Sequence, residues 1–333
     1  MVVIGGGLAG MATAVWLAEL GYAVTLLESN GNLGGRTIGL TSKHGDAVEN
    51  GQHVLAGSYE NIFRFLDSIG TRHLLKFPSE FGVRYPGGHA ETFGFGARNI
   101  FRSALRRVRG LSIPTQLAAL PAWARLVRDV ARFDDSLDDI TVDDWFDRLG
   151  FPAPVRRIML NAMVIGLLNE LPSLASAHAF AALLRTGADR VRTHGPGAAR
   201  IGYPTVDLGQ FYIEAAQRTM ARLGVDVRLR SRAVRVTVAD GRATGVELSD
   251  KSSVAADAVV LAVPSWNLRA LLDDVPGSED ARLAAKQLEP IPIMNAYVLL
   301  DRPLGTVAPW ESLLDSDIGW VFVIDEIDLG LFV

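Results

Sequence analysis

Three glycines near the start of the chain have the spacing of a phosphate-binding turn. A short β-branched run at 2–4 leads directly into the segment GGGLAG at 5–10. In the pattern GxGxxG, the first glycine, Gly5, allows a tight turn, and the second, Gly7, lets the backbone approach a pyrophosphate. The third, Gly10, allows a helix to pack closely on the preceding strand. This segment therefore predicts binding of a dinucleotide.

The elements around these glycines complete the pattern. Leu8 and Ala9 begin a segment with apolar residues at helical spacing, which ends at Gly21. The unpaired N–H groups and the positive dipole end at the start of such a helix attract phosphates. A second strand is expected at 23–27, followed by Glu28, whose carboxylate can accept hydrogen bonds from an adenosine ribose. The stretch is therefore expected to be a βαβ unit with its acidic residue in place.

A further pair of glycines follows the second strand. The segment LGGR at 33–36 resembles the GG-R segment of the flavin amine oxidase and carotenoid desaturase superfamily. The resemblance implies FAD as the cofactor, with Gly34 and Gly35 in the motif and Arg36 lying against the pyrophosphate. The alternative for Arg36 is a solvated arginine in a loop. The resemblance also implies that the backbone of Val234, in a later segment, lies near the adenine.

The segment ENGQH at 49–53 contains two candidates for a catalytic acid. In the superfamily that the chain resembles, the equivalent stretch passes the isoalloxazine ring. The resemblance implies that Gly51 allows close approach and that backbone groups at Gln52 and His53 face the flavin. Glu49 and His53 are the candidates because they neighbour this stretch. For each of them, the alternative is a structural hydrogen-bonding role.

Later strands are expected to return to the sheet that starts at residue 2. The continuous apolar run at 256–263 is typical of a buried parallel strand, and another strand is expected at 226–229. We therefore expect an α/β fold, like that of flavin amine oxidases, in which a Rossmann-type FAD-binding domain is interleaved with an α+β substrate domain. The expected ranges are 1–70 and 203–265 for the first domain, and 71–202 and 266–333 for the second.

The second domain is expected to contain both strands and loops. A hairpin is expected around 84–88, and strands at 292–300 and 318–323. The segment 187–202 is expected to be a mobile loop. The acidic run at 134–144 is expected to be a solvated connection, with N-caps such as Thr141 for the helix around Trp145.

Two amphipathic segments precede that acidic run. Arginines recur at helical spacing through 98–111, with apolar residues on the other side, and 117–133 continues the apolar pattern. A basic amphipathic helix with aromatic residues can lie on an anionic membrane. A core helix with a solvated arginine face is the alternative, and the sequence alone favours it. Peripheral membrane contact near 98–130 is therefore left open.

Composition excludes several other classes of function. The net charge of -4 argues against a general nucleic-acid surface. The chain has no cysteine, which excludes disulfides, thiolate catalysis and cysteine-bound zinc, and fits a reducing, cytoplasmic location. No long apolar run predicts a membrane-spanning helix, and no histidine pair has the spacing of a metal site.

Longer segments support a narrower resemblance. They resemble the hydroxysqualene dehydroxylases, the squalene-associated FAD-dependent desaturases of hopanoid biosynthesis, over most of residues 1–323. The segments are 51–70, 140–150, 168–185, 202–216 and 319–322. The resemblance implies reductive removal of an allylic hydroxyl from a polyisoprenoid, hydroxysqualene, to give squalene. The alternatives are a carotenoid desaturase or an amine oxidase of the same fold.

The end of the sequence departs from this family. Its members close the flavin site with a C-terminal segment that is rich in glycine and carries an acidic residue. The sequence stops at Val333 without such a motif, so a C-terminally truncated chain is expected. A non-catalytic remnant that keeps the nucleotide-binding fold is the alternative from another class.

Overall fold

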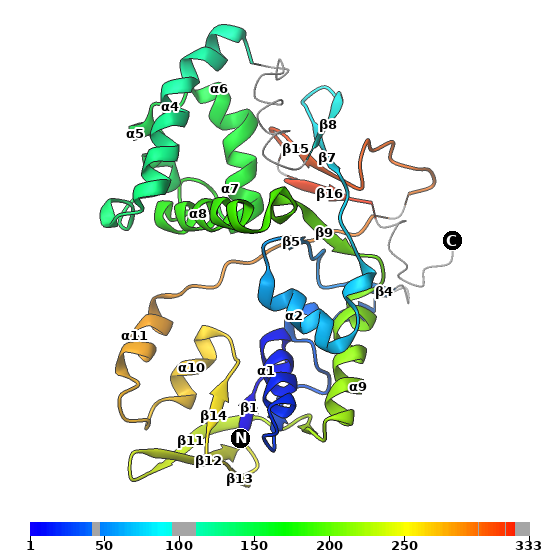
Figure 1. The fold of residues 1–333 in the computed structure, drawn as a ribbon, viewed down its shortest axis with the longest axis vertical. Coiled ribbons are helices and arrows are strands. Elements are labelled where there is room, and N and C mark those ends of the chain that lie inside the picture. Colours follow the sequence, from blue (N-terminus) through cyan, green and yellow to red (C-terminus); the bar gives the residue numbers. More distant parts are fainter. Residues whose placement is uncertain (42–46, 95–110, 299, 317, 324–333) are drawn as a thin grey trace.

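A computed structural model describes residues 1–41, 47–94, 111–298, 300–316 and 318–323. Helices α4 to α8 gather at one end of the molecule, and strands β1, β11 and β14 lie at the other (Figure 1). The expected basic helix at 98–111 and the tail at 324–333 lie mostly or wholly outside the described residues.

A parallel sheet of four strands carries the glycine-rich turn. Its strand order is β10-β2-β1-β14, and each strand is parallel to its neighbours. Val2 pairs with both Thr25 and Val259, so the first strand lies in the middle of the sheet. The bounds are Val2–Ile4 (β1), Thr25–Leu27 (β2), Asp226–Arg228 (β10) and Val259–Leu261 (β14).

Helices cover one face of this sheet. Their apolar side chains form one buried cluster with Val3 and Leu26, and the cluster joins residues from both ends of the sequence, such as Met11, Phe65 and Phe211. The cluster explains the apolar spacing of these helices, because each contributes one face to it. The elements are α1 (Leu8–Glu19), α2 (Glu60–Ile69), the π-helix η6 (Gly209–Glu214) and α9 (Ala215–Arg222).

An antiparallel sheet and a helix cover the opposite face. Leu271 packs in one buried cluster with Ile4, Leu27 and Val246. Helix α10 therefore packs with the first sheet. The predicted domain limits stay a prediction. The elements are β11 (Ala233–Ala239), β12 (Arg242–Leu248), β13 (Ser253–Ala255) and α10 (Ser265–Leu271), and α11 (Glu279–Gln287) follows.

The helical end of the molecule has its own core. Trp145, Phe146 and Phe180 are fully buried there. The prediction of a loop at 187–202 is wrong in its first half, because α8 continues to His194. Gly195 is its C-cap residue, and Pro196 follows. The helices are α4 (Ile113–Arg132), α5 (Val142–Leu149), α6 (Ala153–Val155), the π-helix η4 (Arg156–Leu160), α7 (Asn161–Leu168) and α8 (Ala177–His194).

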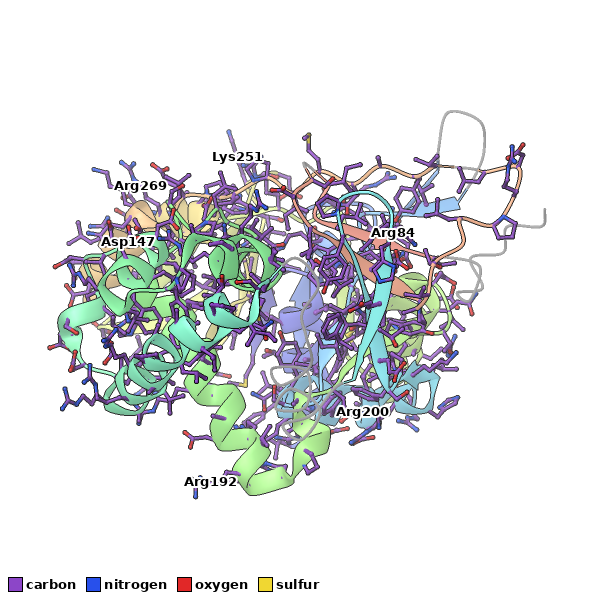
Figure 2. The ribbon with its side chains drawn as sticks, turned by 90° about the horizontal axis from the view of Figure 1, so that it is seen from above. Arg84, Asp147, Arg192, Arg200, Lys251 and Arg269 are labelled. Atoms are coloured by element: carbon purple, nitrogen blue, oxygen red, sulfur yellow. The ribbon has the colours of Figure 1, made fainter. Side chains whose placement is uncertain are left out.

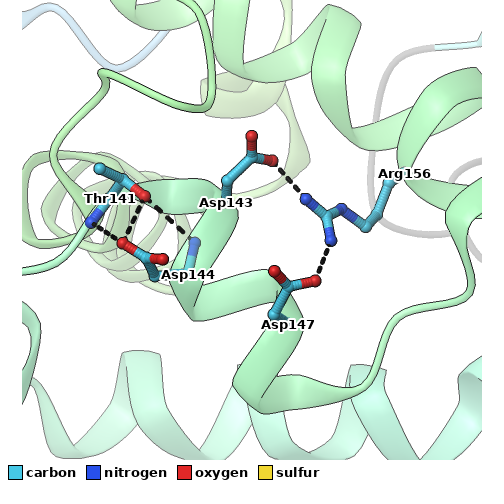
Figure 3. Close-up of polar contacts among 5 residues, drawn as sticks. All are labelled: Thr141, Asp143, Asp144, Asp147 and Arg156. Atoms are coloured by element: carbon cyan, nitrogen blue, oxygen red, sulfur yellow. Dashed lines mark hydrogen bonds and ion pairs between the residues drawn. The ribbon is translucent and has the colours of Figure 1, made fainter.

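The start of α5 shows how the acidic run is used. Thr141 and Asp144 form a capping box, in which each side chain accepts a hydrogen bond from the backbone N–H of the other residue (Figure 3). Asp143 and Asp147 both bind the guanidinium of Arg156. The N-cap prediction is confirmed. The acidic run at 134–144, predicted to be a solvated connection, is partly helical. The ion pairs of Asp143 and Asp147 with Arg156 also attach α5 to the π-helix η4.

A mixed sheet joins two distant parts of the chain. The expected hairpin is confirmed, since β7 (Glu80–Arg84) pairs with β8 (Ala90–Gly94). Strand β15 (Trp310–Leu313) runs parallel to β7 and antiparallel to β16 (Trp320–Phe322). Arg84, labelled in Figure 2, ends β7 and binds the buried Glu311.

Short strands connect these units. The pairs are β3 (Gly39–Thr41) with β4 (Ala47–Glu49), and β9 (Ile201–Pro204) with both β5 (Leu55–Ala56) and β6 (Leu75–Lys76). Single 3-10 turns lie at Gly35–Thr37 (η1), Arg72–Leu74 (η2), Asp135–Leu137 (η3) and Pro196–Ala199 (η5).

The strand expected at 292–300 is not formed. The described residues of that segment have no strand pairing, and Met294 and Val298 are exposed. Pro290 and Pro292 lack the N–H groups that a sheet ladder needs, and no described strand lies in register beside them. The strand predicted at 292–300 is therefore wrong for the described residues of this segment, because no described strand pairs with them.

Candidate functional site

The glycine-rich turn is packed so closely that only glycine fits at two positions. Gly5 has φ +106, and a Cβ there would stand 2.4 Å from the carbonyl oxygen of Ala262. A Cβ on Gly10 would stand 1.8 Å from the carbonyl oxygen of Gly5. The tight turn and the close helix–strand packing expected from the spacing are both present.

The start of helix α1 is open to a ligand. Gly7 is its N-cap and makes no side-chain capping bond, and the first turn contains no acidic residue. The N–H groups of Leu8 and Ala9 therefore lack intrahelical partners, as do the first N–H groups of any helix. A Cβ on Gly7 would meet nothing nearer than the Gly35 Cα, at 4.0 Å. Open backbone donors at a positive helix end fit a pyrophosphate.

Glu28 is held rigidly beside this turn. One carboxylate oxygen, Oε2, accepts the Gly6 N–H at 2.7 Å. The other, Oε1, accepts the Asn30 backbone N–H at 2.7 Å, the Asn30 amide at 3.0 Å and the Ser29 hydroxyl at 3.1 Å. Oε1 thus accepts three protein donors and Oε2 only one, so Oε2 is the oxygen that a further donor such as a ribose hydroxyl would use.

The segment that carries Val234 runs alongside Glu28. The Ser231 N–H donates to the Glu28 carbonyl oxygen at 2.8 Å, and the Arg230 N–H donates to that of Asn30 at 2.9 Å. Val234 follows three residues later in β11 and is half-buried. Its proposed place near an adenine stays a prediction.

The second glycine pair lies directly on the first turn. Gly34 forms a parallel bridge with Gly7, and its N–H donates to the Gly6 carbonyl oxygen at 2.8 Å. A Cβ on Gly35 would stand 3.2 Å from the Gly7 Cα. Arg36 follows in the turn η1 and is exposed. The structure thus brings 5–10 and 34–36 together, as a shared pyrophosphate site requires.

The ENGQH segment is attached to this glycine pair through β3 and β4. The Asn50 N–H donates to the Ile38 carbonyl oxygen at 3.2 Å, and its side-chain amide donates to the Arg36 carbonyl oxygen at 3.2 Å. Burial, and to a lesser extent the nearby charge of Arg36, lower the pKa of His53. His53 therefore lies near enough to Arg36 for the charge of the guanidinium to act on its imidazole ring. Gly51 has φ +100 and faces Asn295, whose amide nitrogen would stand 2.7 Å from an added Cβ.

Glu49 is the most strongly perturbed acid of the site. It is 5% exposed at the end of β4. Its Oε1 accepts the Leu208 N–H at 2.6 Å, and its Oε2 accepts the Gln52 amide at 3.3 Å. Burial, partly offset by the Leu208 bond and reinforced by the charge of Asp207, raises the pKa of Glu49 to about 7.

The sequence did not reveal the residues around Glu49. Burial and the Glu49 charge raise the pKa values of Tyr212 and Tyr297. The Tyr297 hydroxyl is buried within reach of the Gly51 backbone and the Gln52 side chain, yet makes no well-formed hydrogen bond to a described residue. One sequence feature near these residues marks the start of a helix, namely Asp207. Its side chain accepts the Gln210 N–H at 3.0 Å, as the side chain of an N-cap residue does.

The predicted site residues therefore fall into two connected groups. One runs from the glycine turn through Gly34 and Arg36 to Glu49 and His53, and the other joins Glu28 to the segment of Val234. Among the described residues, no group of three histidine or acidic side chains could hold a metal ion.

Comparison with known proteins identifies the family. The profile of the flavin containing amine oxidoreductases matches residues 8–330. The chain belongs to this family. Its membership confirms the superfamily resemblance drawn from the sequence and supports FAD as the cofactor, in agreement with the donors found at the glycine turn.

Two curated relatives have related names. The 15-cis-phytoene desaturase of Arabidopsis thaliana is 26% identical, over 95% of this chain and 56% of that protein. The hydroxysqualene dehydroxylase of Zymomonas mobilis is 23% identical, over 97% of this chain and 73% of that protein. The chain thus spans about half the length of the phytoene desaturases that it matches.

A solved structure confirms the fold. An oxidoreductase from Methanosarcina mazei superposes with a TM-score of 0.62 at 17% identity, over 87% of this chain and 65% of that one. The likeness agrees with the expected α/β, flavin amine oxidase-like fold. Within the described part of this chain, no helix is both long and apolar enough to cross a bilayer.

Proposed function

We propose that this chain is part of an FAD-dependent oxidoreductase that acts on a polyisoprenoid. The observation that carries the proposal is the contact of the two glycine segments at Gly7 and Gly35, which continues through Arg36 to the ENGQH segment. In a flavin containing family, the glycine segments at one end of this chain of contacts can hold the pyrophosphate of the cofactor. The backbone of the segment 49–53, at the other end, can lie against the flavin ring. The substrate class is supported by the names of the two curated relatives.

Within that class, we propose reductive dehydroxylation of hydroxysqualene to squalene. In this reaction the allylic C–O bond breaks, the oxygen takes up a proton and leaves as water, and the carbon receives a hydride. FAD, when bound and reduced, supplies the hydride chemistry. The protein must hold the substrate, exclude water and deliver the proton.

The two candidate acids differ in their environments. Burial and Arg36 lower the pKa of His53, which favours a neutral imidazole near pH 7 and makes it a poor acid. Burial raises the pKa of Glu49 to about 7, so it keeps its proton to a higher pH than an ordinary carboxyl group. Its carboxyl group is however buried and bonded to Leu208 and Gln52.

A carotenoid desaturase is the second candidate function. The relatives with that name are slightly more similar to this chain than the dehydroxylase is, at 26% against 23% identity. Desaturation removes hydrogen from the substrate and needs an electron acceptor, whereas dehydroxylation consumes a reduced flavin. The redox direction therefore distinguishes the two functions.

We also propose that helix α4 contacts an anionic lipid surface. Leu117 and Leu120 are both 59% exposed, and they lie on one stripe of the helix with Ile113 and Val127. The exposed Arg128 lies beside Val127 on the same helix and pairs with Asp129. An exposed apolar stripe on a helix suits a membrane interface, where a polyisoprenoid would reside.

The central experiment measures flavin binding and then turnover. The absorbance spectrum of the purified chain with added FAD should show bound flavin. Anaerobic incubation of the reduced protein with hydroxysqualene should then give squalene by mass spectrometry. Conversion of phytoene by the oxidised protein instead would favour the desaturase, and absence of bound flavin would contradict both.

A further inference from the structure

Glu49 connects two segments that lie far apart in the sequence. Its Oε1 accepts the Leu208 N–H at 2.6 Å across a separation of 159 residues. On one side, Glu49 ends strand β4 and directly precedes the segment 50–53. On the other side, Leu208 precedes the π-helix η6, which continues into α9. The carboxylate is therefore the point at which the ENGQH segment is fixed to a helix of the first core.

The same carboxylate also fixes the segment locally. Its Oε2 accepts the Gln52 amide at 3.3 Å, so Glu49 holds a residue on the far side of Gly51. Gly51 itself has φ +100, a conformation that side chains other than glycine rarely adopt. The bond between Glu49 and Gln52 spans Gly51 and holds the two ends of this turn together.

The surroundings of Glu49 do not suit a proton donor. The residue is 5% exposed, and both carboxylate oxygens face protein donors. The hydroxyls of Tyr212 and Tyr297 lie close enough for the Glu49 charge to act on them. A general acid must reach the substrate directly or through one water, and the bonds to Leu208 and Gln52 direct both oxygens into the protein instead.

We infer that Glu49 is a positioning residue, which clamps the 50–53 segment to the start of helix η6 so that its backbone is held in place for the flavin. The inference rests on the proposed flavin site. The clamp depends on an acceptor for the Leu208 N–H rather than on an ionisable group. A glutamine side chain keeps a carbonyl acceptor at the same position, whereas alanine removes it.

The first test uses the protein without added flavin. Hydrogen exchange of the amides in 208–212 should be at least about tenfold faster in Glu49→Ala than in the wild type, because loss of the acceptor leaves the buried Leu208 N–H without a partner. Glu49→Gln should stay within about threefold of the wild type. Glu19→Gln, an exposed acid on α1, serves as the control. Unchanged exchange in Glu49→Ala would overturn the clamp.

The second test uses FAD. If the wild type binds FAD, Glu49→Ala should weaken binding about tenfold or more, and Glu49→Gln should restore it and keep turnover. A Glu49→Gln variant that binds FAD normally but has no turnover would make Glu49 the proton donor and would overturn the inference. Equal FAD affinity in all three proteins would also overturn it.

The two proposals can fail separately. A wild type that binds no FAD contradicts the proposed function, while the exchange comparison still decides whether the clamp exists. Urea unfolding of each variant measures its global stability and so distinguishes a local effect from general destabilisation. A clamp predicts that Glu49→Gln has wild-type amide exchange and wild-type flavin affinity, at a global stability similar to that of the other proteins.

Discussion

The Cα of Gly10 lies so close to the carbonyl oxygen of Gly5 that a single methyl group would stand 1.8 Å from it. This contact seats helix α1 on the first strand and thereby fixes the donors at the start of that helix. Gly187, in the interior of helix α8, has no atom other than its chain neighbours and the adjacent backbone of its own helix within 4 Å of the position that a methyl group would occupy. The two glycines form a matched pair, one at a contact and one in open space.

The first prediction compares the stability of the protein when each of these two glycines is replaced by alanine. Gly10→Ala should lower the free energy of unfolding by about 1–3 kcal/mol or more, because the helix must move off the strand. Gly187→Ala should raise it by about 0.5–1 kcal/mol, because alanine is the better helix former. Urea unfolding measures both. Equal effects of the two substitutions would contradict the packing described here.

The second prediction separates flavin binding from folding. Gly7→Ala places a methyl group in open space, with only the Gly35 Cα at 4.0 Å, and Gly7 has the ordinary φ of -75. Its cost in stability should be about 1 kcal/mol or less, as for other unfavourable N-cap residues. FAD affinity should nevertheless fall about tenfold or more, because the methyl group stands where the pyrophosphate would approach. Titration of flavin fluorescence checks this, and an unchanged affinity would place the cofactor elsewhere.

The third prediction concerns Arg84 and Glu311. Glu311 is 1% exposed, and it binds Arg84 through both oxygens, at 2.7 and 3.1 Å, as well as the Val307 N–H at 2.6 Å. Glu311→Ala should lower the free energy of unfolding by about 1.5–3 kcal/mol, because it removes the carboxylate partner of Arg84, which keeps only the Gly88 and Gly305 carbonyl oxygens, and the acceptor of the Val307 N–H. Asp301→Ala, at an exposed ion pair with Arg302, should change it little. Thermal unfolding of the two variants gives the comparison.

The fourth prediction concerns pH. The pKa of Glu49 is raised from 4.5 to about 7 in the folded protein, so the folded state holds a proton that the unfolded state has lost. The contribution of Glu49 to stability should therefore decrease as pH rises from about 4.5 to about 7, by roughly 2–3 kcal/mol in total.

Comparison with Glu49→Gln isolates this contribution. His53 has a lowered pKa and contributes the opposite slope, since the folded state disfavours its protonated form below pH 6.5. The free energy of unfolding of wild type minus that of Glu49→Gln should fall across the window. A flat difference would show that Glu49 is ionised normally in the folded chain.

The fifth prediction tests the stripe on helix α4. Leu117→Gln combined with Leu120→Gln should weaken cosedimentation with phosphatidylglycerol vesicles by about tenfold or more, because each leucine contributes on the order of 1 kcal/mol or more when buried. Leu283→Gln on α11 has a similar exposure of 61% and should leave binding unchanged. Equal loss in both variants, or no vesicle binding by the wild type, would count against a specific lipid surface.

Local pattern was sufficient to predict the first half of the site. Gly5, Gly10 and Glu28 lie within one βαβ unit, where spacing alone determines turn, packing and the placement of the acid. The capping box at Thr141 was predictable for the same reason, because its partner is three residues away.

The rest depends on contacts that spacing does not encode. Glu49 and Leu208 are 159 residues apart, and neither the bond nor the raised pKa could be inferred before the core joined them. The strand expected at 292–300 was predicted from the segment alone, whereas a strand forms only where another strand is placed to pair with it. Helix α8 extended beyond its expected end because Gly187 is tolerated inside a helix of strong helix formers.

The position of β1 between β2 and β14 has a consequence for synthesis of the chain. The carbonyl oxygen against which Gly5 is packed belongs to Ala262, so the ribosome makes the two sides of the turn far apart in time. Until the second side emerges, the apolar first strand has an unpaired edge. We expect the newly made N-terminal part to require protection from aggregation, by a chaperone or by the ribosome surface, until the later strand arrives.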